Sequence, residues 1–151
     1  MAGDLPFLRH LFIANRWAAF ASLAANEQQR LALLSQQFDL QDTHYRNFFP
    51  ATDRRIVTVD GAPVGRIYLL REEPMWTLID LSLLPEITGQ GVGSRLIDAM
   101  VTEADAARRP ITLHCSMTNP AFEIYKAKGF VEVRAEGADW VMERWPSGRV
   151  S

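Results

Sequence analysis

The chain has 151 residues, a formal net charge of −2, and a composition that is 48% hydrophobic and 23% charged. This length suits a single domain spanning residues 1–151, and the balanced charge disfavours a protein that coats nucleic acid. The single cysteine, Cys115, excludes an intrachain disulfide framework, and three scattered histidines give no reason to expect a metal site.

No apolar stretch approaches the roughly 20 residues that a membrane-spanning helix needs. The first residues, MAGD, place an acid where a secretory signal would carry a base. We therefore expect a cytoplasmic protein that does not associate with membranes, and its size suits a small enzyme or a small-molecule binder.

The N-terminal third has the pattern of two helices. Residues 4–20 carry an apolar stripe, with Asp4 at the expected N-cap and Pro6 in the first turn. A second helix is expected over residues 26–48, with a break near residues 39–42. The buried face of this second helix is predicted to comprise Leu31, Leu34, Phe38, Tyr45 and Phe48.

Strands dominate the rest of the chain. Residues 54–59 and 64–70 are expected to form a hairpin around the turn Asp60-Gly61. The later elements expected are a central strand at 76–84, a helix at 91–108, a strand at 111–115, a helix at 119–127 and a strand pair at 130–134 and 139–145. This order predicts an α+β fold with a mixed, largely antiparallel central sheet flanked by helices.

A glycine-rich turn, TGQGVGS at residues 88–94, joins the central strand to a helix. Glycines let the backbone approach a ligand, and the first N–H groups of a helix favour a phosphate; the alternative is a tight turn that binds nothing. A P-loop needs Gly-Lys followed by Ser or Thr, which the chain lacks, and a dinucleotide site needs a third glycine where Leu96 stands. The pyrophosphate of coenzyme A is the third option.

Two motifs in order carry a family resemblance. The segment LSLLPEITGQGVGSRL (residues 81–96) resembles the acyl-CoA-binding motif of the GCN5-related N-acetyltransferases (GNAT). The segments NPA (119–121) and YKAKGF (125–130) resemble the second motif of that family. The resemblance implies the acyl-CoA N-acyltransferase fold. The chain departs from the family at Thr88, where Arg or Gln is usual, and the strand that usually precedes the first helix is expected to be missing.

The resemblance also implies a reaction, the transfer of an acetyl group from acetyl-CoA directly to a primary amine of a small molecule or peptide. The backbone of Leu81 and Leu83 would pair with the pantetheine, and Asn119, which can cap its helix, is a candidate for a further bond to it. The pyrophosphate would be held by the N–H groups of Gly89, Gln90, Gly91, Val92, Gly93 and Ser94. Arg95, Lys126 and Lys128 either contact the nucleotide phosphates or form a solvated basic face.

Tyr125 occupies the general-acid position of the family and would protonate the leaving thiolate, although its ring can equally serve as a core aromatic. A general base is less evident, because Thr77 and Ile79 stand where family members often carry Glu or His. Asp80 is adjacent, but strand alternation turns it to the other face unless a bulge intervenes, and the alternative is a structural Asp, which is common at this position in the family. His114 is another candidate, against the alternative of a buried structural histidine. Without a dedicated base, a water chain or an already neutral amine would serve.

The acceptor site is predicted from the segment HYRNF (residues 44–48), with Tyr45 as a candidate contact; the alternative is an ordinary amphipathic helix end. A non-catalytic domain that binds acyl-CoA for sensing remains the alternative function. An acetyltransferase acting on aminoacyl-tRNA would need a strongly basic surface to bind the RNA, and the net charge of −2 disfavours such a surface. The expected partners are therefore an amine and acetyl-CoA, without nucleic acid, membrane or metal. A homodimer is left open, because dimers are frequent in the family.

Overall fold

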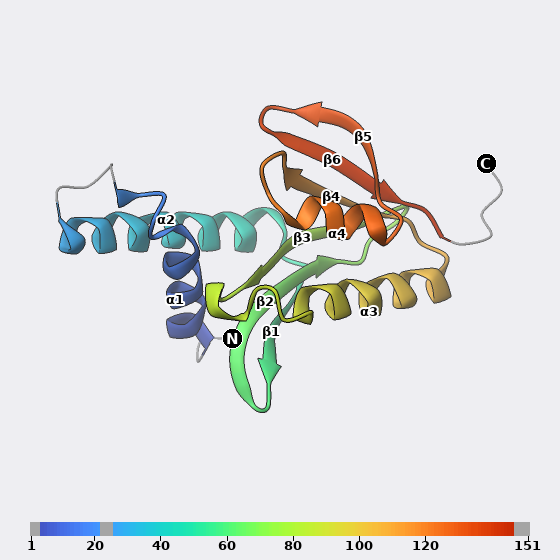
Figure 1. Ribbon diagram of the computed structural model, residues 1–151. Helices are drawn as coiled ribbons and strands as arrows, with labels where there is room; N and C mark the ends of the chain where they lie inside the picture. Colours follow the sequence, from blue (N-terminus) through green and yellow to red (C-terminus); the bar gives the residue numbers. More distant parts are fainter. Residues whose placement is uncertain (1–3, 22–25, 147–151) are drawn as a thin grey trace. The chain divides into compact units, whose positions relative to one another are not determined.

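The computed structural model describes residues 4–21 and 26–146 (Figure 1). Two helices come first, α1 (Leu5–Arg16) and α2 (Glu27–Phe48), followed by the hairpin strands β1 (Asp53–Val59) and β2 (Ala62–Leu70). The remaining elements are β3 (Trp76–Leu83), the short 3-10 helix η3 (Pro85–Ile87), α3 (Val92–Ala107), β4 (Ile111–Ser116), α4 (Ala121–Ala127), β5 (Val131–Glu136) and β6 (Asp139–Arg144).

The strands form one sheet in the order β1-β2-β3-β4-β6-β5. β3 and β4 run parallel, while β6 pairs antiparallel with both β4 and β5. This is the mixed α+β fold predicted from the sequence. Within the described ranges, α1 comes before every strand; residues 1–3, on which part of the expectation of a missing first strand falls, lie outside those ranges.

By contacts between backbone positions, the chain divides into two compact units. The first comprises Met1–Ile67 and Leu81–Thr88, and the second comprises Tyr68–Asp80 and Gly89–Ser151. β2 and β3 each contribute residues to both units. The units are described separately below.

In the first unit, α1 and α2 pack through a small apolar core of Leu8, Phe12, Leu34 and Phe38. The rings of Phe12 and Phe38 meet edge to face, with centroids 5.7 Å apart. Arg9 lies over Phe38 and pairs with Asp39 at 2.9 Å, which fixes the two helices further. Aromatic edge-to-face pairs and cation–π contacts of this kind add modestly to the burial of apolar area.

Helix α2 begins as predicted but differs in two respects. The side chain of Asn26 accepts a hydrogen bond from the Gln29 N–H at 2.8 Å and so caps the helix. The helix then runs without the predicted break near residues 39–42. Leu31 and Phe48, expected on the buried face, are 49% and 69% exposed, so this part of the prediction is wrong. Leu34 and Phe38, predicted on the same face, are buried, so this part of the prediction is confirmed.

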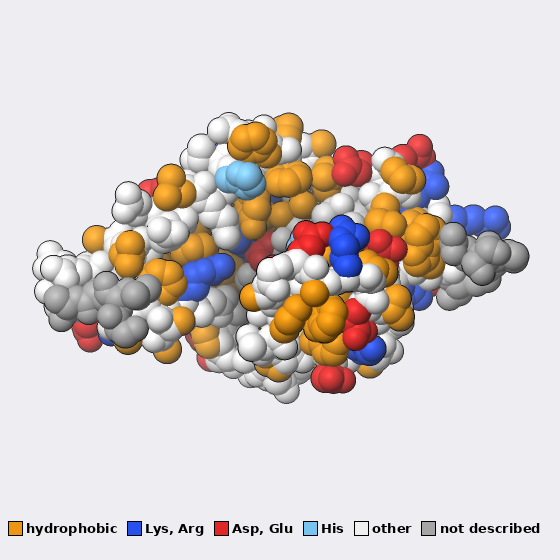
Figure 2. Space-filling view, turned by 90° about the horizontal axis from the view of Figure 1, so that it is seen from above, with side chains coloured by type: hydrophobic (Ala, Val, Ile, Leu, Met, Phe, Trp, Pro, Cys, Tyr) orange, Lys and Arg blue, Asp and Glu red, His pale blue; other side chains and the backbone are white. Residues whose placement is uncertain are grey.

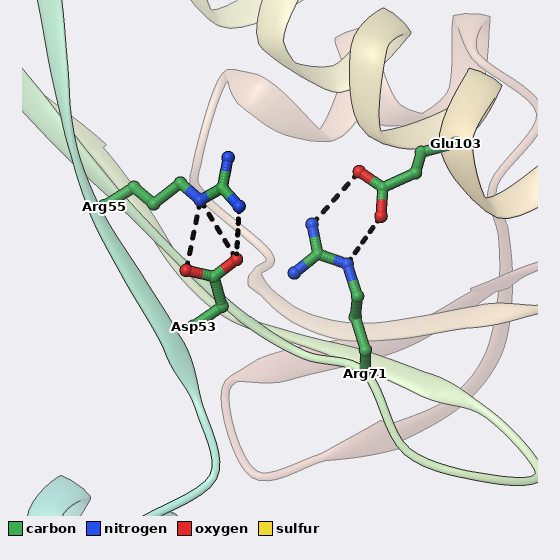
Figure 3. A network of polar contacts seen from close by, with 4 residues as sticks. All are labelled: Asp53, Arg55, Arg71 and Glu103. Atoms are coloured by element: carbon green, nitrogen blue, oxygen red, sulfur yellow. Dashed lines mark hydrogen bonds and ion pairs between the residues drawn. The ribbon is translucent and has the colours of Figure 1, made fainter.

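The β1–β2 hairpin turns at Asp60 and Gly61, as predicted. Both residues have positive φ, 51° and 81°, which is the backbone of a two-residue hairpin turn. In β1, Arg55 pairs with Asp53 at 2.9 Å, as Figure 3 shows. In β2, the buried Arg66 donates to the side-chain oxygen of Gln41 on α2 at 2.8 Å, which links helix and strand.

In the second unit, helix α4 packs against β4 (Figure 1). The buried positions of β4 are Ile111, Leu113 and Cys115, which alternate along the strand as one face of a sheet should. Helix α3 buries Val92, Ile97, Met100 and Ala104, whereas Leu96, predicted on this face, is half-buried. None of the helices in the described ranges is long and apolar enough to cross a membrane.

Candidate active site

The glycine-rich turn occupies the connection from β3 through η3 to α3. Gly89 and Gly91 adopt φ values of +86° and +80°, which L side chains rarely accept. A Cβ atom built on either would meet nothing within 4 Å. The glycines are therefore required here by backbone conformation and not by crowding, and the space over the turn is open to a ligand.

Helix α3 starts directly after this turn. Gly91 is its N-cap residue, and the first helical hydrogen bond runs from the Arg95 N–H to the Gly91 carbonyl at 3.1 Å. The amides of Val92, Gly93 and Ser94 precede that bond, so they have no partner within the helix. Together with the helix dipole, these amides favour an anion at the exposed turn.

Thr88 does not offer its hydroxyl hydrogen to a ligand. Its Oγ1 donates to the carbonyl of Pro85 at 2.7 Å and closes the η3 turn. The engagement of this hydroxyl leaves the main-chain N–H groups described above as donors for a phosphate. Figure 2 shows Lys and Arg side chains next to Asp and Glu side chains on the face that it draws.

The parallel ladder between β3 and β4 is short. It runs from Trp76 opposite Ile111 to Leu78 opposite Leu113, and both strands continue beyond the last pair. The family resemblance implies that the pantetheine pairs with the part of β3 that lies beyond this ladder.

Leu81 and Leu83 lie in the continuation of β3 and are half-buried. The neighbouring strand β2 places Gly65 against this segment, and a Cβ at Gly65 would lie 2.4 Å from the carbonyl oxygen of Ser82 and 2.6 Å from a methyl of Leu83. The sequence reading missed Gly65, although a lone glycine inside a strand is a recognised sign of close backbone approach.

Tyr125 is buried on α4, with a 7% exposed side chain. Its ring meets that of Phe130 edge to face at 5.5 Å, as expected of a core aromatic. Burial, together with the nearby Cys115 and Asp80, raises the pKa of Tyr125 well above its usual value. The phenol is consequently protonated throughout the neutral range.

The candidate bases differ in their surroundings. Asp80 on β3 is half-buried and lies near enough to Tyr125 for its charge to act on that phenol. His114 is exposed on β4, so the expectation of a buried structural histidine is wrong. Cys115, on the opposite face of β4, is buried, and this burial raises the pKa of its thiol.

Asn119 precedes α4, and its side-chain oxygen accepts the Ala121 N–H at 2.9 Å. Its main-chain carbonyl also accepts the Phe122 N–H at 3.0 Å. The N-cap residue of α4 is Pro120, which has no side-chain cap bond, so Asn119 lies one position before the expected cap and binds the helix start through a local turn. Asn119 is exposed, which leaves its amide group within reach of a ligand in solution.

Tyr45 lies half-buried near the C-terminal end of α2, in the first unit. Its neighbour His44 is exposed and lies beside three rings, with centroid distances of 6.1 Å to Tyr45, 4.8 Å to Phe48 and 5.9 Å to Phe49. Phe48 is 69% exposed, so the inward position expected for an ordinary amphipathic end does not hold. The segment presents aromatic rings to solvent.

The basic residues near the second motif are engaged in ion pairs. Lys126 pairs with Glu132 at 2.6 Å and Lys128 with Asp98 at 2.7 Å, whereas Arg95 is exposed on α3. The hydrogen bond from Lys126 also lowers the pKa of Glu132. Across residues 4–21 and 26–146, no cluster of three or more His, Cys, Asp or Glu side chains could hold a metal ion.

Comparison with known proteins gives a family match. The sequence model described as "Acetyltransferase (GNAT) domain" matches residues 45–132 of the chain. No protein with a curated function matches it in sequence.

Similar folds occur among solved structures. The PaiA N-acetyltransferase of Thermoplasma acidophilum, solved in complex with coenzyme A, has 20% identity and a TM-score of 0.68 over 95% of this chain and 93% of its own. A GCN5-related N-acetyltransferase of Rhodopseudomonas palustris has 23% identity and a TM-score of 0.68 over 96% and 91%. The ribosomal-protein-S18-alanine N-acetyltransferase of Escherichia coli has 18% identity and a TM-score of 0.60 over 73% and 79%. At these identities the likeness shows the fold.

Proposed function

This chain belongs to the GCN5-related N-acetyltransferase family, and from that premise we propose that it transfers an acetyl group from acetyl-CoA directly to a primary amine of a small molecule or peptide. The observation that carries the proposal is that one compact unit contains both the open glycine turn at the start of α3 and the buried, protonated Tyr125 of α4. The first suits an acyl-CoA pyrophosphate, and the second suits a leaving thiolate.

Binding of acetyl-CoA would use main-chain groups. The amides from Gly89 to Ser94 would hold the pyrophosphate, because the first amides of α3 lack helical partners and both φ-positive glycines leave the turn open. The backbone of Leu81 and Leu83 would pair with the pantetheine, with Asn119 supplying a further polar contact. The open glycine turn and the short β3–β4 ladder support this assignment.

In the reaction, the amine nitrogen attacks the thioester carbonyl carbon, the new C–N bond forms and the C–S bond breaks. The sulfur leaves as a thiolate and takes the Tyr125 hydroxyl proton, or is stabilised by a hydrogen bond from it; the attacking nitrogen loses a proton. Because the pKa of Tyr125 is raised, the proton is always present at neutral pH, while complete transfer is harder than from a free phenol. The rest of the rate enhancement is supplied by orientation of the two substrates.

The proton of the amine needs an acceptor. Asp80 is the candidate side chain, because its charge already acts on Tyr125 in the same unit. An α-amine, with a pKa of about 8, is neutral to a larger extent at a given pH than a lysine side chain with a pKa of about 10, so it would need less assistance. We therefore place α-amines and weakly basic amines first in an acceptor panel, with Tyr45 as a contact residue to test.

The proposal is tested by calorimetry with acetyl-CoA and by coenzyme A release in the presence of a panel of amines. Turnover with at least one amine is expected, together with a fall in kcat of about 10²-fold or more in Tyr125→Phe while the Kd for acetyl-CoA stays nearly unchanged. If acetyl-CoA binds and no amine accelerates release of coenzyme A, the chain is instead a non-catalytic acyl-CoA sensor. If kcat survives in Tyr125→Phe, the acid assignment is wrong.

A further inference from the structure

Arg144, the last residue of β6, is bound on three sides within the second unit. Its Nη1 and Nη2 donate to the two carboxylate oxygens of Asp105 on α3, at 2.7 and 3.1 Å. Its Nε donates to the main-chain carbonyl of Lys128, directly after α4, at 2.8 Å. The side chain is only 12% exposed. A forked arginine–carboxylate pair of this kind fixes direction as well as distance.

The chain around Lys128 is shaped to admit this guanidinium. Gly129 has φ +98°, and a Cβ there would lie 3.3 Å from the Nε of Arg144. A second link joins the same segment to α3, because the Nζ of Lys128 pairs with Asp98 at 2.7 Å. Asp98 and Asp105 are seven positions apart, about two helical turns, and so lie on the same side of α3.

The segment held by Arg144 is hydrogen-bonded to the backbone of Tyr125. The carbonyl of Tyr125 accepts the N–H groups of Lys128 and Phe130, each at 3.0 Å. The Tyr125 ring also meets the ring of Phe130 at 5.5 Å. Movement of the Lys128–Phe130 corner would therefore be passed directly to Tyr125 through main-chain bonds and a ring contact.

We propose that Arg144 is a positioning residue for acetyl transfer, which sets α4 and its Tyr125 against α3, the helix whose first turn would hold the pyrophosphate. The inference rests on the proposed function, in which Tyr125 protonates the leaving thiolate. An acid acts only within hydrogen-bond reach, and a displacement of about 1 Å can lower a rate by about 10²-fold. Arg144 touches neither substrate in this proposal and acts through Tyr125.

The test is a double-mutant cycle on kcat with Arg144→Lys and Tyr125→Phe. Lysine keeps the charge but cannot form the fork and the third bond at once, so Arg144→Lys should lower kcat by about tenfold or more with little change in the Kd for acetyl-CoA. In the Tyr125→Phe background, Arg144→Lys should lower kcat no further, because the group that it positions is absent. Equal losses in both backgrounds would overturn the inference and leave Arg144 a structural residue.

Arg71→Lys is the matched control. Arg71 also forms a fork to α3, from its Nε and Nη2 to the carboxylate of Glu103 at 2.6 and 3.0 Å (Figure 3), and Glu103 lies on α3 as Asp105 does. The Arg71→Lys substitution should change kcat by no more than about twofold. A loss equal to that of Arg144→Lys would show that any fork on α3 has this effect, and would overturn the inference.

Two further results separate the proposals from one another. If Tyr125→Phe alone leaves kcat unchanged, the acid role fails and the positioning role fails with it. If Tyr125→Phe lowers kcat and Arg144→Lys adds its full loss, only the positioning role fails.

A second variant covers the case in which Arg144→Lys does not fold. Should Arg144→Lys lose its cooperative thermal transition, Asp98→Asn takes its place, since it weakens the second link to Lys128. The same non-additivity with Tyr125→Phe is then expected, and additivity overturns the inference.

Discussion

The carbonyl oxygen of Ser82 on β3 points into the position where a side chain of residue 65 on β2 would begin. A Cβ at Gly65 would lie 2.4 Å from that oxygen, a separation that real Cβ atoms essentially never show. Gly65 is buried and has no positive φ that would require glycine. The glycine is therefore needed for space, beside the segment whose backbone we assign to the pantetheine.

Gly65→Ala should consequently push β3 away near Leu81 and Leu83. Crowding in a packed interior lowers the free energy of unfolding by about 1–3 kcal/mol, and the KM for acetyl-CoA should rise more than kcat falls. Gly137→Ala is the control: its φ of +60° strains alanine, but its Cβ meets nothing within 4 Å. This control should lose stability without changing KM. Equal KM values for the two variants would contradict the assignment of this segment to acetyl-CoA.

Gly91 and Gly61 form a matched pair for testing the pyrophosphate site. Their φ values are +80° and +81°, and neither Cβ would meet an atom within 4 Å. Alanine at either position should lower stability by a similar amount, about 1–2 kcal/mol. Only Gly91→Ala should weaken coenzyme A binding in calorimetry, because only its methyl would enter the anion site. The binding of pantetheine, which lacks the pyrophosphate, should be less affected. Equal effects on coenzyme A from both variants would argue against a site at this turn.

The two roles assigned to Asn119, in the start of α4 and in binding acetyl-CoA, can be tested separately. Asn119→Ala removes the bond to the Ala121 N–H and should lower stability by about 1 kcal/mol in urea unfolding. Asn119→Asp keeps the accepting oxygen, so its stability should stay near that of the natural chain. It loses the amide donor, and its affinity for acetyl-CoA should fall. Unchanged affinity in Asn119→Asp would limit this residue to its bond with the Ala121 N–H.

The pH dependence of Tyr125 has a definite sign. Its pKa is raised by burial and by the nearby Cys115 and Asp80, so the folded chain keeps the proton at pH values where an unfolded tyrosine, with a pKa near about 10, loses it. The stabilisation is complete below about pH 10 and is lost as pH rises through the folded pKa. In urea unfolding, the free energy of unfolding of Tyr125→Phe should decline less steeply above about pH 10 than that of the natural chain. The kcat of the natural chain should show no loss from deprotonation of Tyr125 below that pH. An acid limb near pH 8 that disappears in Tyr125→Phe would contradict this.

Local signals in the sequence were enough for most elements. Asp60-Gly61 adopts the positive φ values that its turn type demands, Asn26 caps α2, and Gly91 starts α3. Each of these features depends on a few consecutive residues. The exposure of Phe48 depends instead on which element covers α2. Because α1 has 12 residues and α2 has 22, α1 can cover only part of the length of α2.

Only part of the site could be predicted from the sequence, because some of its features are local and others depend on contacts between residues far apart in the chain. The glycine turn is local, so its position followed from the sequence, whereas the N-cap of α4 is Pro120 and not the predicted Asn119. The residue type alone favours a buried structural role for His114, whereas strand alternation with the buried Leu113 and Cys115 places it on the opposite, exposed face. The bonds of Arg144 join residues 16 and 39 positions apart. No local spacing encodes such a contact, and only the folded chain reveals it.

The amides at the start of α3 have a consequence for the tolerance of this helix to substitution. They are left over by the geometry of a helix end, so the anion site that we propose there depends on where the helix begins and very little on its side chains. The exposed positions Arg95, Ala99, Thr102 and Ala106 lie along one face of α3. Sequence can therefore drift along that face, through changes of charge and size, while the affinity for the nucleotide end of acetyl-CoA is retained.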